Sequence, residues 1–196
     1  MKTAQLVSLG LVAAAAAACG GGTAAVATKQ AAPQAPAGQQ HAKTNQVAAT
    51  GSGRCATRDL TVHLGAAGGA AGSTYEPLVF TNKGSATCTL DGYPGVSFVA
   101  PQTGKQVGAA ASRNPQHAAT SVSLAAGASA SAMVQVVNHA NYDPASCKAT
   151  TVSGLRVYPP GSTTAAYVPF THTQQACSTS VNQLSVQAVV AGTSGM

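Results

Sequence analysis

Residues 75–96 read YEPLVFTNKGSATCTLDGYPGV, and this stretch decides the fold class. Apolar residues alternate at 78–80, as in a half-buried strand, and turn-forming residues follow at 82–84. The alternation returns at 88–90 before a second turn at 91–92. Two short strands that are each closed by turn residues predict a β-sheet.

The same two-residue alternation recurs along the body of the chain, and no helical period of useful length appears after residue 55. The predicted strands lie around residues 60–64, 78–80, 88–90, 96–98, 122–124, 130–136, 155–157, 168–170 and 184–188. About nine strands predict an all-β fold, an antiparallel, immunoglobulin-like β-sandwich. The absence of Trp excludes the antibody type of core. The glycine-rich residues 65–72 lack a phosphate-loop ending and predict a flexible loop instead.

Four cysteines lie in the body of the chain: Cys55, Cys88, Cys147 and Cys177. An even number predicts two disulfides, and we favour the pairs Cys55–Cys88 and Cys147–Cys177. Each bond would close a loop of roughly 30 residues and contribute on the order of 3–4 kcal/mol. The nested pairing, Cys88–Cys147 inside Cys55–Cys177, stays open. Two disulfides indicate an exported protein in an oxidising compartment.

The fifth cysteine, Cys19, ends an apolar run at residues 6–18 that follows Lys2. About 13 apolar residues suit a signal peptide and are too few to span a bilayer. The sequence AAACG at 16–20 resembles a bacterial lipobox, which predicts a diacylglyceryl anchor on Cys19 and a place on the outer face of the cell membrane. Ala16 departs from the usual leucine, so the alternative is a cut by ordinary signal peptidase and a secreted protein.

These features divide the chain into four parts. Residues between the signal and the body are mostly Ala, Gly, Gln, Thr and Pro, which bury too little apolar surface to offset chain entropy. We therefore predict a lipoprotein signal peptide at 1–18, a disordered tether at 19–54, a β-sandwich domain at 55–190 and a flexible tail at 191–196.

The composition narrows the possible partners. Ten Lys and Arg against four Asp and Glu give a formal net charge of +6. The basic residues are scattered with little aromatic interleaving, which argues against nucleic-acid binding. The expected partners are the membrane, through Cys19, and a cell-wall polymer or another envelope protein.

No motif for catalysis or for a cofactor is evident. The histidines and cysteines lack the short spacings of a zinc site, and no Gly-x-Ser-x-Gly elbow is present. Of the four acidic residues, Asp91 and Asp143 fit turn chemistry. We therefore predict a non-enzymatic protein without cofactor or metal. An enzyme with a convergent site is an alternative, and it would use Asp59, Glu76 or a histidine.

Several motifs together resemble a known family. They are FTNKG at 80–84, TCTLDGYPGV at 87–96, GLRVYPP at 154–160 and the late Cys177. This combination is similar to an uncharacterised domain family, a domain of unknown function found in actinobacterial secreted proteins and lipoproteins. The resemblance spans residues 55–190. It implies a small β-sandwich with paired cysteines, and it implies no activity or catalytic residue.

Surface recognition is the remaining function class. Tyr and Arg are favoured anchors of binding surfaces, and the candidates here are Tyr93, Pro94, Tyr142, Arg156 and Tyr158. The leading hypothesis is a lipid-tethered binding module for a wall polymer, a small ligand or a protein. The alternative is a secreted inhibitor that presents residues 92–95 to a protease or glycosidase.

Overall fold

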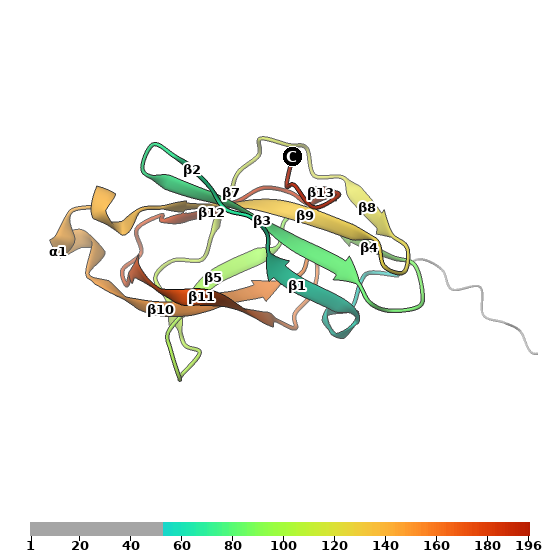
Figure 1. The fold of residues 1–196 in the computed structure, drawn as a ribbon, viewed down its shortest axis with the longest axis horizontal. Helices are drawn as coiled ribbons and strands as arrows, with labels where there is room; N and C mark the ends of the chain where they lie inside the picture. Colours follow the sequence, from blue (N-terminus) through green and yellow to red (C-terminus); the bar gives the residue numbers. More distant parts are fainter. Residues whose placement is uncertain (1–52) are drawn as a thin grey trace, which may run out of the picture. The chain divides into compact units, whose positions relative to one another are not determined.

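The computed structural model describes residues 53–196. The predicted signal peptide, the anchor residue Cys19 and the tether up to residue 52 lie outside the described residues. Within the described part, two main β-sheets pack face to face, as Figure 1 shows. The chain body is therefore an all-β sandwich, which confirms the predicted fold class.

One sheet has the strand order β1-β3-β9-β12-β7, with β2 paired to β3 and β13 paired to β9. Its strands are β1 (Leu60–Leu64), β2 (Gly68–Ala70), β3 (Ser73–Asn82), β7 (Ser112–Arg113), β9 (Ser129–Val137), β12 (Leu184–Val186) and β13 (Val190–Ala191). Its pairings are antiparallel except that between β12 and β7.

The other main sheet has the order β11-β10-β5-β6 and is antiparallel. Its strands are β5 (Gly95–Val99), β6 (Gln106–Val107), β10 (Ala149–Tyr158) and β11 (Ala166–Cys177). A separate antiparallel pair joins β4 (Cys88–Asp91) to β8 (Ser121–Leu124). The helical turns are η1 (Thr57–Asp59), η2 (His139–Asn141) and α1 (Pro144–Cys147).

The core lies between the two main sheets and follows the predicted alternation. Its largest fully buried side chains are Phe80, Leu78, Leu90, Leu124, Leu155, Leu184, Val96, Val99, Val134, Val152, Val157 and Val186. All nine predicted segments contain a strand, although β12 ends at Val186 rather than at residue 188. The alternation did not predict four strands: β6, β7 and β13 have two residues each, and β2 is the apolar-poor sequence Gly-Gly-Ala.

The glycine-rich segment differs from the prediction of a flexible loop. Residues 68–70 form β2, which pairs with the first residues of β3. Ala71 and Gly72 connect the two strands, and both have positive φ, at 34° and 78°. A two-residue turn of this kind matches the twist of a hairpin, and Gly72 adopts it at little cost. The glycines therefore close a hairpin.

Both favoured disulfides are present, which rules out the nested pairing. Cys55 bonds to Cys88, and Cys147 bonds to Cys177, with sequence separations of 33 and 30. Such bonds persist in oxidising compartments outside the cytoplasm. Between residues 53 and 196, the structure contains no helix that is both long and apolar enough to cross a bilayer.

The last residues are held against β9, although the sequence predicted a flexible tail at 191–196. Ala191 pairs with Ala130, and the buried Ser131 donates its hydroxyl to the Gly192 carbonyl at 2.8 Å. The same hydroxyl oxygen accepts the Gly195 amide at 2.8 Å. The local sequence does not predict these bonds, because Ser131 lies far from residues 191–196 along the chain.

Candidate functional site

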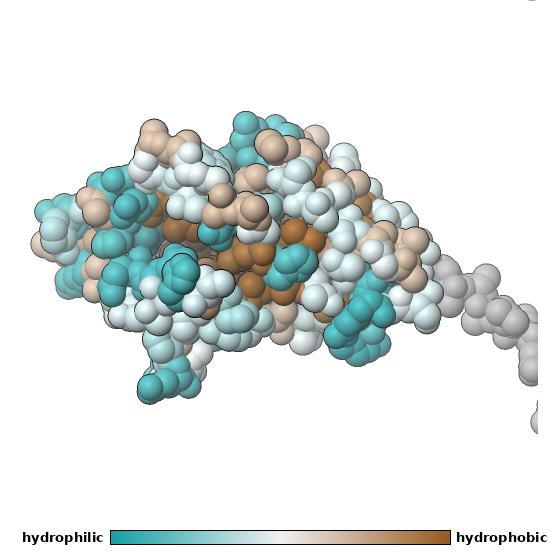
Figure 2. All heavy atoms as spheres, viewed as in Figure 1, coloured by the Kyte–Doolittle hydropathy of each residue, from teal (hydrophilic) through white to brown (hydrophobic). Residues whose placement is uncertain are grey.

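The two main sheets leave one side of the sandwich open between β1 and β11. Each of these strands is the outermost member of its sheet. Between them lies a groove of about 400 Å³ that we call the edge groove. It is lined by Val62 and Leu64 of β1, by Glu76 of β3, and by residues 168–172 and Gln174 of β11. Figure 2 shows apolar surface on this face between the two layers.

An irregularity in β11 shapes the rim of the groove. Val152 of β10 pairs with Gln174, and Gly154 pairs with Pro169. Residues 170–173 therefore stand opposite the single residue Ser153 and leave the ladder. Pro169 has no amide hydrogen to donate to a neighbouring strand, which suits the edge of a sheet. The bulge gives the groove a rim that a regular strand would not provide.

Gly154 explains why β10 can approach β11 so closely at this point. A Cβ atom placed on Gly154 would clash with the carbonyl oxygen of Val168 and with the ring of Tyr167. Because glycine has no side chain, β10 can pair with β11 again at Gly154, directly beside the bulge.

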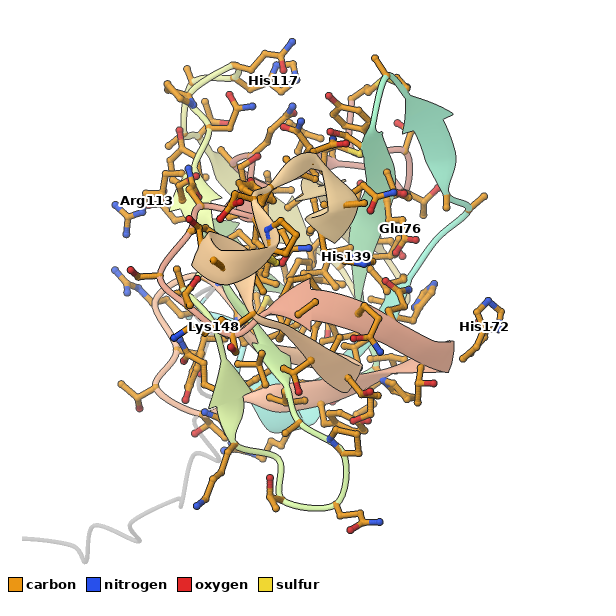
Figure 3. All side chains as sticks on the ribbon, turned by 90° about the vertical axis from the view of Figure 1, so that its left-hand side faces the viewer. Glu76, Arg113, His117, His139, Lys148 and His172 are labelled. Carbon is orange, nitrogen blue, oxygen red and sulfur yellow. A yellow bond between two sulfur atoms is a disulfide. The ribbon has the colours of Figure 1, made fainter. Side chains whose placement is uncertain are left out.

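Glu76 is the carboxylate of the edge groove. It lies on β3 two residues before Leu78 and four before Phe80, which are both fully buried. Side chains two residues apart on a strand share a face, so the Glu76 side chain belongs to the inward face. Figure 3 shows Glu76 between the two layers. Burial raises the pKa of this carboxyl above its ordinary value of 4.5, because removal from water disfavours the charged form.

No side chain in the described part of the chain neutralises Glu76. The ion pair found among residues 53–196 is Arg58–Asp59, at 3.8 Å. The side-chain hydrogen bonds of the same residues do not involve the Glu76 carboxylate, whereas Asp143, for comparison, accepts the amide of Ser146 at 3.0 Å. The edge groove therefore carries an uncompensated negative charge.

Two histidines border the same groove. His63 of β1 and His172 of β11 line it and are exposed. Figure 3 shows His172 directed outward, away from the body of the protein. Among residues 53–196 no three His, Cys, Asp or Glu side chains are grouped to hold a metal ion. The arrangement is that of a groove with both apolar and polar walls, one half-buried carboxylate and two exposed histidines at its rim.

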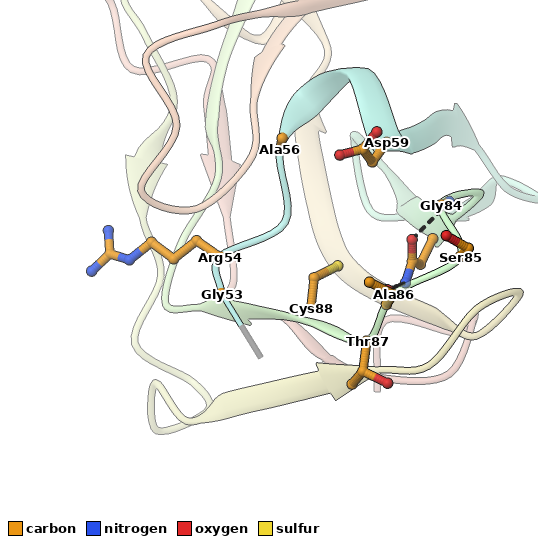
Figure 4. Close-up of a pocket in the computed structure, with 10 residues that line it drawn as sticks. Gly53, Arg54, Ala56, Asp59, Gly84, Ser85, Ala86, Thr87 and Cys88 are labelled. Carbon is orange, nitrogen blue, oxygen red and sulfur yellow. Dashed lines mark hydrogen bonds between the residues drawn. The ribbon is translucent and has the colours of Figure 1, made fainter. Parts of the chain in front are cut away.

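Two other hollows lie elsewhere on the described part of the chain. One, of about 360 Å³, lies beside the Cys55–Cys88 bond and is lined mainly by loop residues. Figure 4 shows Arg54 directed away from it, and its other charged residue, Asp59, is paired with Arg58. The second, of about 590 Å³, lies on the outer face of β3 and β9 and is partly built by residues 193–196.

The predicted recognition residues have intramolecular partners. Tyr93 is half-buried, and the Arg113 guanidinium lies 5.4 Å from the centre of its ring. Pro94 is buried. The Tyr142 hydroxyl donates to the Asn182 carbonyl at 2.7 Å, which fastens the region of η2 to the chain before β12.

Arg156 and Tyr158 lie on β10 opposite the buried Leu155 and Val157, as the alternation predicted. Both are half-buried, and the Arg156 guanidinium donates to the Gly104 carbonyl. None of the five predicted residues lines the edge groove, and Tyr142 belongs to a different region from the other four. Their role as a binding surface stays a prediction.

The sequence predicted Glu76 as a residue of an alternative enzyme site and did not predict its place in a groove. Leu78 and Phe80, two and four residues further on, are buried, and this alternation places the Glu76 carboxylate on the inward face of β3.

The fold and the groove together define the class: a small, disulfide-linked β-sandwich domain with a ligand-sized groove between the edges of its sheets. The chain belongs to the family described as Domain of unknown function (DUF4232), whose model matches residues 55–190. No curated protein and no solved structure shows a significant match to the chain.

Proposed function

We propose that this protein is a lipid-anchored, extracytoplasmic binding module that holds its ligand in the edge groove. The single observation that carries the proposal is the groove itself: an open cleft, lined by both apolar and polar side chains, with a half-buried carboxylate that no side chain of residues 53–196 neutralises. A half-buried carboxylate without a partner loses part of its hydration, so a role in ligand binding is a reason for its presence.

The volume and lining of the groove suit a ligand. At about 400 Å³ it falls within the range of small-molecule sites, which are mostly apolar with a few polar groups that fix orientation. The walls are contributed by strands rather than by long loops, and the nearby core is well packed. A site on such a rigid frame loses little entropy when it binds.

The remaining parts of the proposal rest on the sequence. The signal and lipobox-like residues support an anchor on Cys19, and the composition of residues 19–54 supports a tether. A domain held in this way at the cell surface would meet wall polymers and other envelope proteins, which are the partners that we propose.

A retention experiment tests the proposal. The mature protein is incubated with cell-wall fractions and with envelope proteins of the producing cell, and the retained material is quantified for the wild type and two variants. Thr171→Arg adds bulk and charge to the lining of the groove. Thr173→Arg makes the same change in the same bulge, at an exposed residue that does not line the groove.

We expect the wild type and Thr173→Arg to retain the same component, and Thr171→Arg to bind it at least about tenfold more weakly. No retention by the wild type would argue against a binding module. Equal retention by both variants would move the site elsewhere on the surface.

The inhibitor alternative has less support. Residues 92–95 would have to present side chains to an enzyme cleft, whereas Pro94 is buried and Tyr93 lies beneath Arg113. The Gly92 carbonyl also accepts the Val189 amide at 2.9 Å, which ties the loop to the body. The binding module therefore remains the proposed function.

A further inference from the structure

The edge groove pairs one negative charge with apolar walls, and this pairing restricts the chemistry of an occupant. Glu76 sits at an inward-facing position whose partner across the ladder is Val134, a side chain that is 1% exposed. The groove that it lines also includes the side chains of Val62, Leu64 and Phe170. The half-buried carboxylate thus shares the groove with hydrocarbon.

We propose that the edge groove binds an organic ammonium ion, with the ammonium group at the Glu76 carboxylate and an aliphatic stem along Val62, Leu64 and Phe170. This inference rests on the proposed binding function and names its ligand class. An alkylammonium ion meets both demands of the site, because it carries a compact charge at the end of an apolar chain.

Charge complementarity favours a cation over a neutral or anionic ligand. Attraction between opposite charges is stronger near hydrocarbon than in bulk water, because the effective dielectric constant is lower. The Glu76 carboxylate accepts hydrogen bonds and has no donor among residues 53–196, so the N–H groups of an ammonium would satisfy it. An anion of the same shape would meet repulsion at this position.

A metal ion is a poorer fit than an organic cation. A metal ion requires several ligands in a fixed geometry, and among residues 53–196 no three His, Cys, Asp or Glu side chains are grouped to hold one. The hydrocarbon side chains of the groove would instead shield the stem of an alkylammonium from water.

A separate hollow borders the edge groove. It has a volume of about 220 Å³, shares Gln174 with the groove and is also lined by Thr74, His139 and Gln183. Its side-chain amides and hydroxyl can hydrogen-bond to polar parts of a longer ligand that reaches beyond the ammonium site.

The titratable groups around the site give the binding a defined pH dependence. Glu76 of β3, His63 of β1 and His172 of β11 line the edge groove, and His139 lies at the adjoining hollow. Acid protonates the carboxylate, and the loss of its negative charge opposes the binding of a cation. The raised pKa of Glu76 places this loss at higher pH than for an exposed glutamate.

A comparison of three matched probes tests the inference. The full mature protein is titrated with n-hexylammonium, hexanol and hexanoate at about pH 8, well above the ordinary carboxyl range, and binding is followed by amide NMR shifts. The same titrations use Glu76→Gln, which keeps the shape and removes the charge. The control is Asp91→Asn, which removes one negative charge from an exposed residue away from the groove.

We expect n-hexylammonium to bind the wild type and Asp91→Asn with the same affinity, with shifts confined to β1, β3 and β11. Glu76→Gln should lower this affinity by on the order of tenfold or more. Because the pKa of Glu76 is raised, acidification should also weaken the binding of n-hexylammonium to the wild type and not to Glu76→Gln. Hexanol should bind more weakly than the cation, and hexanoate more weakly still.

Equal binding of the three probes, or equal binding by Glu76→Gln, would overturn the ammonium site. If Thr171→Arg nevertheless abolishes retention of an envelope component, the binding module stands and its ligand is of another class. If neither experiment detects binding in the groove, the proposed function fails as well.

Discussion

At the scale of single residues, Asn82 shows how one side chain fixes a whole corner of the fold. It is 1% exposed, and its amide nitrogen donates to the carbonyls of Ala86 and Leu124 at 2.8 and 3.0 Å. Its amide oxygen accepts the Gly84 amide at 2.9 Å, a bond that Figure 4 marks. A buried polar side chain with its hydrogen bonds satisfied specifies one loop geometry. The Asn of the FTNKG motif is therefore structural.

Glu76 is the opposite case, a polar residue whose charge the described fold leaves unsatisfied. Because its pKa in the folded protein is raised, the folded state holds this proton more tightly than the unfolded state. Stability is therefore highest below the ordinary pKa of 4.5 and falls as the pH rises through the raised value. At neutral pH the ionised carboxylate destabilises the protein.

We expect Glu76→Gln to unfold at a higher temperature than the wild type at about pH 7, by up to a few °C. The gain should shrink as the pH falls below 4.5, where the wild-type carboxyl is also neutral. Thermal unfolding followed by circular dichroism across this pH range measures both effects. A variant that is less stable than the wild type at neutral pH would show that the carboxylate has a stabilising partner.

At the scale of elements, the ends of β11 and α1 are joined by the Cys147–Cys177 bond. Hydrogen bonds reinforce this junction: the Ser178 hydroxyl donates to the Lys148 carbonyl at 2.8 Å, and the Thr179 hydroxyl donates to the Ser146 carbonyl. The Asp143 side chain caps α1, and Pro144 is its first residue. The junction positions the end of β11 that leads into the edge groove.

Replacement of both cysteines of either disulfide by serine should lower the free energy of unfolding by about 3–4 kcal/mol, because the unfolded chain regains the entropy of a loop of some 30 residues. The loops are similar in length, with separations of 33 and 30, so the two double variants should lose similar amounts. Urea denaturation of each variant beside the oxidised wild type measures the loss. A loss below about 1 kcal/mol would mean that the corresponding bond contributes little.

At the scale of the whole molecule, the proposed function joins an anchor and a tether to a folded body. The described body carries seven of the ten Lys and Arg residues and all four acidic residues, so its formal net charge is +3 (7 − 4). A modest positive charge favours residence near anionic wall polymers, whereas the edge groove is locally negative. The groove therefore favours a cation, whereas the surface as a whole attracts anions.

Mass spectrometry of the membrane-extracted mature protein tests the anchor and the disulfides together. We expect a mass that begins at Cys19 and includes a diacylglyceryl group, and a gain of two hydrogens for each disulfide upon reduction, four in all. Cys19→Ser serves as the control and should appear in the soluble fraction. A mature protein without lipid would indicate cleavage by ordinary signal peptidase, and no gain upon reduction would contradict the disulfides.

The local sequence was sufficient for most strands, although it did not predict the hairpin that Ala71 and Gly72 close. Alternation at residues such as Leu78 and Phe80 gave nine of the strands and their buried faces, because side chains alternate strictly along an extended chain. The even number of cysteines in the body predicted two disulfides. The preference for short loops favoured the pairing that the structure contains. The motifs also pointed to the family that the comparison shows.

Only the tertiary structure decided which segments meet. The edge groove exists because β1 and β11, about a hundred residues apart in the chain, end as the outer strands of facing sheets. The bulge at residues 170–173 depends on the register with β10, and the packing of residues 191–196 depends on Ser131. Such contacts follow from the summed packing of the whole core rather than from any local pattern, so the carboxylate of Glu76 gains its apolar surroundings only when the chain folds.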